Sequence, residues 1–212
     1  MKKVFILFLC FFCFSQNIHA EEDLTVHAQS AYLIEATTGK VLYDKNGEEK
    51  LFPASMTKMM SLILVYEALN DGSLKLDEVL SISENAASMG GSQVFLQPNE
   101  QMNVHDLLKA VCISSANDAM VALAERISGS VSEFVSKMNE KSKELNLVNT
   151  NFENTTGLHD ENHYSCAKDM ALIAKKLIEV GKDDLLSITS TYDAYIREDT
   201  NPFWLVNTNK LV

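Results

Sequence analysis

Ser55 and Lys58 are a pair of residues whose types and spacing could perform chemistry. A separation of three residues places both side chains on one face of a helix, with the amine within reach of the hydroxyl. A serine in the first helical turn also lies beside unpaired backbone N–H groups, which favour developing negative charge. If burial removes the proton of the lysine, the two residues can act as a nucleophile and its general base.

The same spacing occurs a second time, at Ser165 and Lys168. Serine and lysine are common, so about one such match per 200 residues is expected by chance. We interpret this second copy as a helix N-cap serine followed by an exposed lysine on the next turn. The spacing alone therefore does not distinguish a catalytic pair from a helix cap.

Ser115 and Asn117 form a second candidate for chemistry. A hydroxyl and an amide two positions apart could relay a proton and hold an amide of a substrate. The pattern is also common, because Ser83 and Asn85 repeat it. The alternative is that Ser115 and Asn117 only cap a helix over residues 118–127. On spacing alone, both interpretations stay open.

Hydrophobic periodicity predicts the elements that must position these residues. Residues 30–35 and 40–44 read as a β-hairpin with Gly39 at the turn, and residues 189–197 read as a strand. Helical spacing is found at residues 55–70 before Gly72, and at residues 104–113, 117–127, 131–145 and 167–180. Residues 82–103 and 149–165 are expected to be loops. A hairpin, several helices and a returning strand predict an α+β domain whose sheet closes late in the chain.

Composition narrows the class of protein. The chain has 212 residues and a formal net charge of −11, with a pI of 4.9. This length suits one domain with a sizeable core. The acidic balance, without a basic patch, argues against nucleic acid as a partner. After residue 20, no segment approaches the ~20 apolar residues that span a bilayer.

The first twenty residues read as a secretory signal peptide. Lys2 and Lys3 precede an unbroken apolar run over residues 4–14, and Ala20 ends a plausible cleavage site. The alternative is a buried N-terminal helix. We therefore expect an exported protein whose remaining domain covers residues 21–212. Its two remaining cysteines, Cys112 and Cys166, could form a disulfide outside the cell, but two buried free thiols are expected.

A metal site at residues 159–163 is a further alternative, because His159 and His163 are four residues apart. A zinc protease helix needs Glu directly after the first His, and that position holds Asp160. The Asn and Asp content favours a loop instead. We therefore expect neither a metal nor a cofactor.

Met56, Met59 and other methionines are expected to fill the core.

Longer segments surround the candidate residues in a fixed order along the chain. They are residues 30–34, 39–42, 53–58, 91–96, 113–119, 157–160 and 163–165. This ordered set closely resembles the D-alanyl-D-alanine carboxypeptidases, which are low-molecular-mass penicillin-binding proteins and serine peptidases. The resemblance implies a β-lactamase/transpeptidase-like α+β fold, with an antiparallel sheet and a helical subdomain. It also implies that the protein works outside the cytoplasm, at the cell wall.

The resemblance assigns a role to each candidate residue. Ser55 would attack the penultimate D-Ala of a peptidoglycan stem peptide ending in D-Ala-D-Ala, and Lys58 would take its proton. Ser115 would relay the proton to the leaving amine, and Asn117 would orient Lys58 and the substrate; both would contact the substrate. The backbone N–H of Ser55 would stabilise the oxyanion. β-Lactams would act as inhibitors by forming a slowly hydrolysed ester with Ser55.

One motif of the resembled family, Lys-Thr-Gly or Lys-Ser-Gly on a sheet strand, does not occur in the 212 residues. In the family, the segment at residues 209–212 lies shortly before that motif. We therefore expect an N-terminal fragment that stops before the closing strands of the sheet. A membrane anchor, if the protein has one, is expected beyond residue 212.

Two competing functions follow from the same motifs. A class A β-lactamase usually has Asp where Ala116 stands, and it needs a deacylating Glu where Ser142 stands. The other alternative is an exported, non-catalytic module that binds peptidoglycan or penicillin. The substitution Ser55→Ala separates these classes, because an enzyme loses acylation whereas a binding module keeps its affinity.

Overall fold

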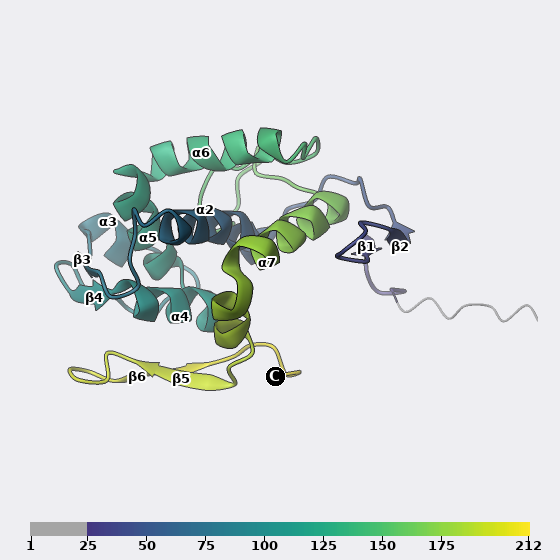
Figure 1. The fold of residues 1–212 in the computed structure, drawn as a ribbon. Helices are drawn as coiled ribbons and strands as arrows, with labels where there is room; N and C mark the ends of the chain where they lie inside the picture. Colours follow the sequence, from purple (N-terminus) through teal and green to yellow (C-terminus); the bar gives the residue numbers. More distant parts are fainter. Residues whose placement is uncertain (1–24) are drawn as a thin grey trace, which may run out of the picture.

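The computed structural model describes residues 25–212 (Figure 1). The predicted signal peptide, with Cys10 and Cys13, lies outside these residues. The elements in chain order are β1 (Ala31–Ile34), β2 (Val41–Lys45), a 3₁₀ turn (Ala54–Thr57), α2 (Lys58–Asn70), β3 (Val79–Ser81), α3 (Glu84–Ala87), β4 (Gln101–Asn103), α4 (Val104–Ser114), α5 (Asn117–Ser128), α6 (Val131–Glu144), α7 (Ala167–Thr189), β5 (Asp193–Ile196) and β6 (Phe203–Val206).

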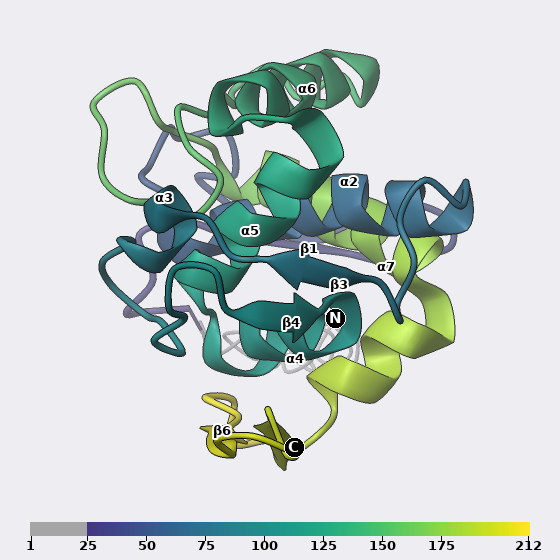
Figure 2. The same ribbon diagram turned by 90° about the vertical axis from the view of Figure 1, so that its left-hand side faces the viewer.

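Helix α2 lies at the centre of the helical layer. In the two perpendicular views, α6 lies on one side of it and α4 on the other (Figures 1 and 2). Every residue from Met60 to Tyr66 is buried. A helix that is buried all round has no solvent-facing stripe, and α2 packs against α5, α6 and α7. The N-terminus of α2, where Lys58 lies, is therefore held in a fixed place.

The strands form three separate two-stranded antiparallel sheets. The predicted hairpin is confirmed as β1 and β2, with Gly39 at φ +71° in the turn. The prediction that the late strand closes this sheet is wrong for the described residues, because β5 pairs with β6. Ile196 and Leu205 on their inner face are fully buried, and both strands pack on α4. Packing on α4 thus holds this late hairpin apart from β1 and β2.

Helix α7 is longer than its sequence pattern predicts. The expected end at residue 180 is wrong, because the helix continues to Thr189 across a kink at Lys182, where φ is +47°. The side-chain amide of Asn70 in α2 donates to the carbonyl of Val180 at 2.9 Å. The hydroxyl of Tyr66 donates to Asp184 at 2.9 Å. These two bonds tie both halves of the kinked helix to α2.

The predicted loop over residues 82–103 is only partly a loop, since it contains α3 and β4. These elements are three or four residues long, too short for a periodic pattern to reveal. The predicted loop over residues 149–165 contains no helix, and isolated bridges join Leu51 to Ser165 and Asn151 to Tyr164. We call residues 149–165 the clamp loop. It lies against the 3₁₀ turn, which we call the Ser55 turn.

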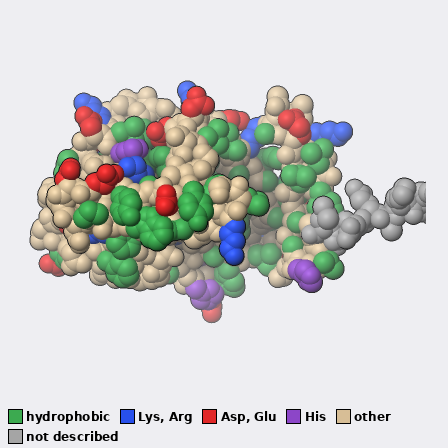
Figure 3. Space-filling view, turned by 90° about the horizontal axis from the view of Figure 1, so that it is seen from below, with side chains coloured by type: hydrophobic (Ala, Val, Ile, Leu, Met, Phe, Trp, Pro, Cys, Tyr) green, Lys and Arg blue, Asp and Glu red, His purple; other side chains and the backbone are tan. Residues whose placement is uncertain are grey.

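The outer face of the β5–β6 hairpin is apolar and exposed. Figure 3 shows hydrophobic side chains gathered over this part of the molecule. Tyr195 and Trp204 are a cross-strand pair on that face, and they are 50% and 54% exposed. Within residues 25–212, no helix is long and apolar enough to cross a bilayer.

Candidate active site

The Ser55 turn presents the serine to solvent and buries the lysine that follows it. Ser55 is exposed, whereas Lys58, the first residue of α2, is 3% exposed. The residue before the serine, Ala54, has φ +47°, a backbone conformation that is unfavourable for alanine. Such local strain persists only where the surrounding structure holds it in place.

Lys58 lies between three oxygen atoms from three different elements. Its Nζ donates to Ser55 Oγ at 3.2 Å, to Ser115 Oγ at 3.1 Å and to the carbonyl of Thr156 at 3.1 Å. None of the ion pairs among the described residues includes Lys58. The predicted catalytic residues Ser55, Lys58 and Ser115 are thus brought together.

Burial lowers the pKa of Lys58 to about 8. Loss of hydration disfavours the ammonium form, and no carboxylate compensates for it. An appreciable fraction of Lys58 is therefore neutral near neutral pH. The neutral amine keeps two N–H donors for its partners and offers one lone pair to a serine proton. This is the protonation state that a general base requires.

Ser115 and Asn117 lie at the junction between α4 and α5. Ser115 ends α4 in the left-handed conformation, with φ +57°. The N-cap of α5 is Ala116, and no side chain caps this helix. The interpretation of Ser115 and Asn117 as side-chain caps is therefore wrong. The left-handed turn directs the Ser115 hydroxyl toward Lys58 instead.

Asn117 is 5% exposed and ties the start of α5 to residues 90–92. Its amide Nδ2 donates to the carbonyl of Gly90 at 2.7 Å, and its backbone N–H donates to Ser92 at 2.7 Å. Its buried Oδ1 has no partner among the described residues. A buried acceptor without a donor is costly. Among the described residues, no hydrogen bond joins Asn117 to Lys58, whose Nζ contacts the two serines and Thr156 instead.

Two features of the site could not be predicted from the candidate residues. The first is the Thr156 carbonyl, which the side chain of Asn154 places by accepting from the N–H groups of Thr156 and Gly157. The second is the carboxylate of Asp118, which accepts from the N–H groups of Val94 and Leu96. Asn154 and Gly157 are turn residues, but a turn signal does not show which carbonyl faces Lys58.

Gly157 allows the clamp loop to approach the Ser55 turn. It has φ +87°, and a Cβ at this position would lie 1.8 Å from the carbonyl oxygen of Ala54. Only glycine fits a left-handed position at this distance. The strained residue before the nucleophile is therefore held by a direct backbone contact.

The second Ser-x-x-Lys sequence makes different contacts. Ser165 Oγ pairs with Thr150 Oγ1 at 2.8 Å, and Lys168 forms an ion pair with Glu48 at 2.6 Å. The prediction that Ser165 is the N-cap is wrong by one residue, because Cys166 caps α7. Glu48 raises the pKa of Lys168. Ser165 and Lys168 therefore do not bond to each other, and Lys168 is not neutral enough to act as a general base.

The two histidines of the alternative metal site do not meet. His159 stacks edge-on against Phe52, whereas His163 is buried and bonded to Thr57. Among residues 25–212, no cluster of His, Cys, Asp and Glu could hold a metal ion.

Cys112 and Cys166 are both free thiols, as expected, although Cys112 is only partly buried. Burial raises the pKa of Cys112 to about 12.

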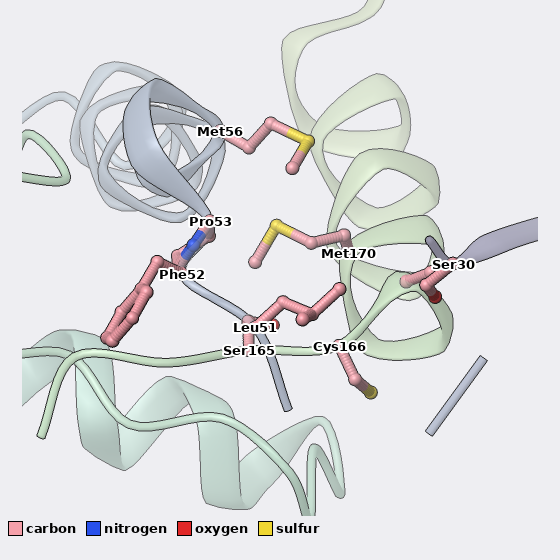
Figure 4. A pocket seen from close by; sticks show the side chains of 9 residues that line it. Ser30, Leu51, Phe52, Pro53, Met56, Ser165, Cys166 and Met170 are labelled. Carbon is pink, nitrogen blue, oxygen red and sulfur yellow. The ribbon is translucent and has the colours of Figure 1, made fainter. Parts of the chain in front are cut away.

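A cavity of about 120 Å³ lies on the far side of the Ser55 turn (Figure 4). Met56 and Met170 extend toward each other across it, above the bridge from Leu51 to Ser165. Met56 is 51% exposed, so the expectation that it fills the core is wrong. A larger cavity of about 390 Å³ borders Ser55, Lys58 and Ser115, with mostly apolar side chains from α4 and α7 around it.

Comparisons with known proteins agree with this geometry. The family model described as D-alanyl-D-alanine carboxypeptidase matches residues 16–212. The chain belongs to this family. D-alanyl-D-alanine carboxypeptidase DacF of Bacillus subtilis is 55% identical over 191 residues, which are 90% of this chain and 49% of DacF. DacC of Escherichia coli is 39% identical over 79% of this chain and 44% of DacC.

Solved structures of two penicillin binding proteins show the same fold. Penicillin binding protein 5 from Haemophilus influenzae matches with a TM-score of 0.78 and 36% identity, over 84% of this chain and 52% of that chain. Penicillin binding protein 6B from Escherichia coli matches with a TM-score of 0.79 and 30% identity, over 86% and 58%. The predicted α+β, penicillin-recognising fold is confirmed. The chain spans about half the length of the curated relatives that it matches.

Proposed function

We propose that the protein is a serine-type carboxypeptidase that removes the terminal D-Ala from peptidoglycan stem peptides ending in D-Ala-D-Ala. The observation that carries this proposal is the position of Lys58, buried without a carboxylate and within 3.2 Å of both serine hydroxyls. The names of the relatives indicate the substrate class. β-Lactams are the inhibitors that we expect to acylate the same serine.

The reaction would begin with neutral Lys58 accepting the proton of Ser55 Oγ, which attacks the carbonyl carbon of the penultimate D-Ala. The backbone N–H of Ser55 would stabilise the oxyanion. When the C–N bond breaks, the proton would pass from Lys58 through the hydroxyl of Ser115 to the leaving D-Ala amine. Water then hydrolyses the ester and releases the shortened stem peptide. Asn117 would orient the substrate.

The family supports an enzyme over the two alternatives. At the position where a class A β-lactamase carries its deacylating Glu, Ser142 is buried in α6 and bonds to the carbonyl of Met138. A buried hydroxyl cannot act as the general base for water.

We also propose that residues 1–20 export the protein and that it acts on the outer side of the cytoplasmic membrane.

The test uses the whole gene product and its Ser55→Ala variant. The purified protein is mixed with a fluorescent penicillin and, separately, with a peptide ending in D-Ala-D-Ala. We expect a covalent adduct on the peptide that contains Ser55, together with release of free D-Ala, and neither in Ser55→Ala. The matched control Ser165→Ala should behave as the unchanged protein. Tight penicillin binding without an adduct would overturn the proposal in favour of a binding module.

A further inference from the structure

The protonation state of His163 can be read from its hydrogen bonds. The side chain is 2% exposed, and the backbone N–H of Glu153 donates to its Nδ1 at 3.1 Å. A backbone N–H can only donate, so Nδ1 carries a lone pair and the ring is neutral. The ring hydrogen therefore lies on Nε2, which donates to Thr57 Oγ1 at 2.7 Å.

Thr57 joins this histidine to the catalytic residues. It is fully buried, ends the Ser55 turn and directly precedes Lys58. The clamp loop, which carries His163, also supplies the Thr156 carbonyl to Lys58. Two backbone hydrogen bonds between Leu51 and Ser165, at 2.8 and 3.0 Å, fix the segment that leads into the turn. The bond from His163 to Thr57 is thus a side-chain link between the clamp loop and the far end of the turn, beside the bond from Ser61 Oγ in α2 to the Thr155 carbonyl at 2.8 Å.

We propose that His163, in its neutral form with the hydrogen on Nε2, is a positioning residue for the acylation of Ser55. It holds the Ser55 turn against the clamp loop through Thr57, so that Lys58 stays between the two serines and the Thr156 carbonyl. This role rests on the proposed function, because it concerns the same serine. His163 touches neither the substrate nor the reacting atoms.

Protonation of His163 leaves the Nε2–H bond to Thr57 in place but removes the bond that Nδ1 accepts from Glu153. A hydrogen on Nδ1 would face the N–H of Glu153, so two donors would be opposed at 3.1 Å. Burial lowers the pKa of His163, while the nearby charges of Asp160 and Glu153 raise it. On the other sides the ring faces the Thr57 hydroxyl and the edge of Phe152, neither of which titrates near neutral pH. Acid is therefore expected to push the backbone of Glu153 away from the ring and so to loosen the clamp loop against the turn, while the backbone bonds between Leu51 and Ser165 still hold its other end.

The pH dependence of acylation tests this role. Lys58 alone gives a logarithmic rate that falls with a slope of about one per pH unit below its pKa. We expect the slope to steepen to about two below the pKa of His163, as measured by NMR. In His163→Gln the slope should stay near one, because an amide N–H can reach Thr57 but does not titrate.

The choice of variants separates positioning from folding. His163→Gln should keep the rate at about pH 7.5 within about threefold, whereas His163→Asn, too short to reach Thr57, should lose about tenfold or more. The matched control is His159→Asn, because His159 is exposed and should not change the rate. A wild-type rate and profile in His163→Asn would overturn the proposal. So would an Nδ1–H tautomer of His163 in the ring ¹⁵N spectrum.

A failure of the positioning role can be told apart from a failure of the proposed function. If no variant is acylated at Ser55, the proposed function fails. His163 is then judged by the pKa of Lys58, measured from its ¹³C side-chain shift. His163→Asn should move this pKa, whereas His163→Gln and His159→Asn should not. Identical values in all three variants would overturn the positioning role.

Discussion

Two copies of the same four-residue spacing stand in very different surroundings. Lys58 is buried, bonded to two hydroxyls and a carbonyl, and has a lowered pKa. Lys168 is partly exposed, paired with Glu48, and has a raised pKa. The serine of the first copy contacts its own lysine, whereas Ser165 pairs with Thr150.

The Ser-x-x-Lys spacing brings a hydroxyl and an amine near each other. The tertiary surroundings decide whether the amine has the lowered pKa that a base needs. Both lysines could reach a hydroxyl one turn away. Only the first is deprived of water and of an acidic partner, which is what lowers the pKa of an amine. The second is an ordinary surface ion pair, of a kind that contributes little to stability.

The largest expected effect separates the two lysines by activity. In Lys58→Met the acylation rate with fluorescent penicillin should fall by about 10²–10⁴-fold, the usual contribution of a general base. In Lys168→Met it should stay within about twofold, because that side chain only loses a surface pair. Stopped-flow or gel-based labelling measures both rates. Equal losses in the two variants would contradict the comparison.

The clamp loop should matter nearly as much. Gly157→Ala would place a methyl group 1.8 Å from the Ala54 carbonyl, so the Ser55 turn must shift. We expect acylation to fall by about 10²-fold, since misplaced reacting groups lose their alignment. The free energy of unfolding should fall by about 2–4 kcal/mol.

The control for that substitution is Gly39→Ala. Gly39 also has positive φ, +71°, but a Cβ there meets nothing within 4 Å. It should cost only about 1 kcal/mol and leave acylation unchanged. Chemical denaturation and labelling measure both quantities. A loss of acylation in Gly39→Ala comparable to that in Gly157→Ala would remove the specific role of the close contact.

The pH profile sharpens the comparison further. Because folding lowers the pKa of Lys58 to about 8, the acylation rate should rise with pH and level off above about 8. Replacing Lys168 should leave that profile in place. A rate that keeps rising until about pH 10, near the ordinary pKa of lysine, would show that Lys58 is not the titrating base.

The smallest expected effect is on stability, and its sign distinguishes the two sites. Folding lowers the pKa of Lys58 from 10.5 to about 8, so at neutral pH its charge costs the native state about 3 kcal/mol. This cost disappears as the pH rises from about 8 to 10.5. Lys58→Met removes the buried charge and should raise the free energy of unfolding at about pH 7. The gain should be only roughly 1–2 kcal/mol, because the hydrogen bonds of Lys58 are lost as well.

Lys168→Met is the matched control for stability. Its exposed ion pair should contribute so little that the free energy of unfolding changes by less than about 0.5 kcal/mol. Denaturation in urea at about pH 7 compares the two variants. A destabilised Lys58→Met would contradict the inference that the buried charge is costly.

The sequence could predict the local parts of this site. Ser55 and Lys58 meet because a helical turn joins them, and that turn is visible as periodicity. Ser115 lies 57 positions after Lys58, and only the ordered resemblance to the family connected them. The Thr156 carbonyl was not predictable, because every residue has a carbonyl and only tertiary packing selects one.

The same limit applies to the fold. The long helices were predictable from the spacing of their apolar residues, although α2 is buried all round and has no separate polar face. The continuation of α7 past residue 180 was not, because it depends on Asn70 and Tyr66 of a distant helix. β6 escaped prediction because its four residues have no pattern of their own and pair only with β5.

The most direct test of the central claim is the pKa of each lysine amine, read from the pH dependence of its ¹³Cε shift. The account predicts about 8 for Lys58 and a value above 10.5 for Lys168 in the same sample. Assignment by the Lys58→Met and Lys168→Met variants makes the comparison unambiguous. If both amines titrate near 10.5, Lys58 is not poised as a base, and the proposed chemistry is contradicted.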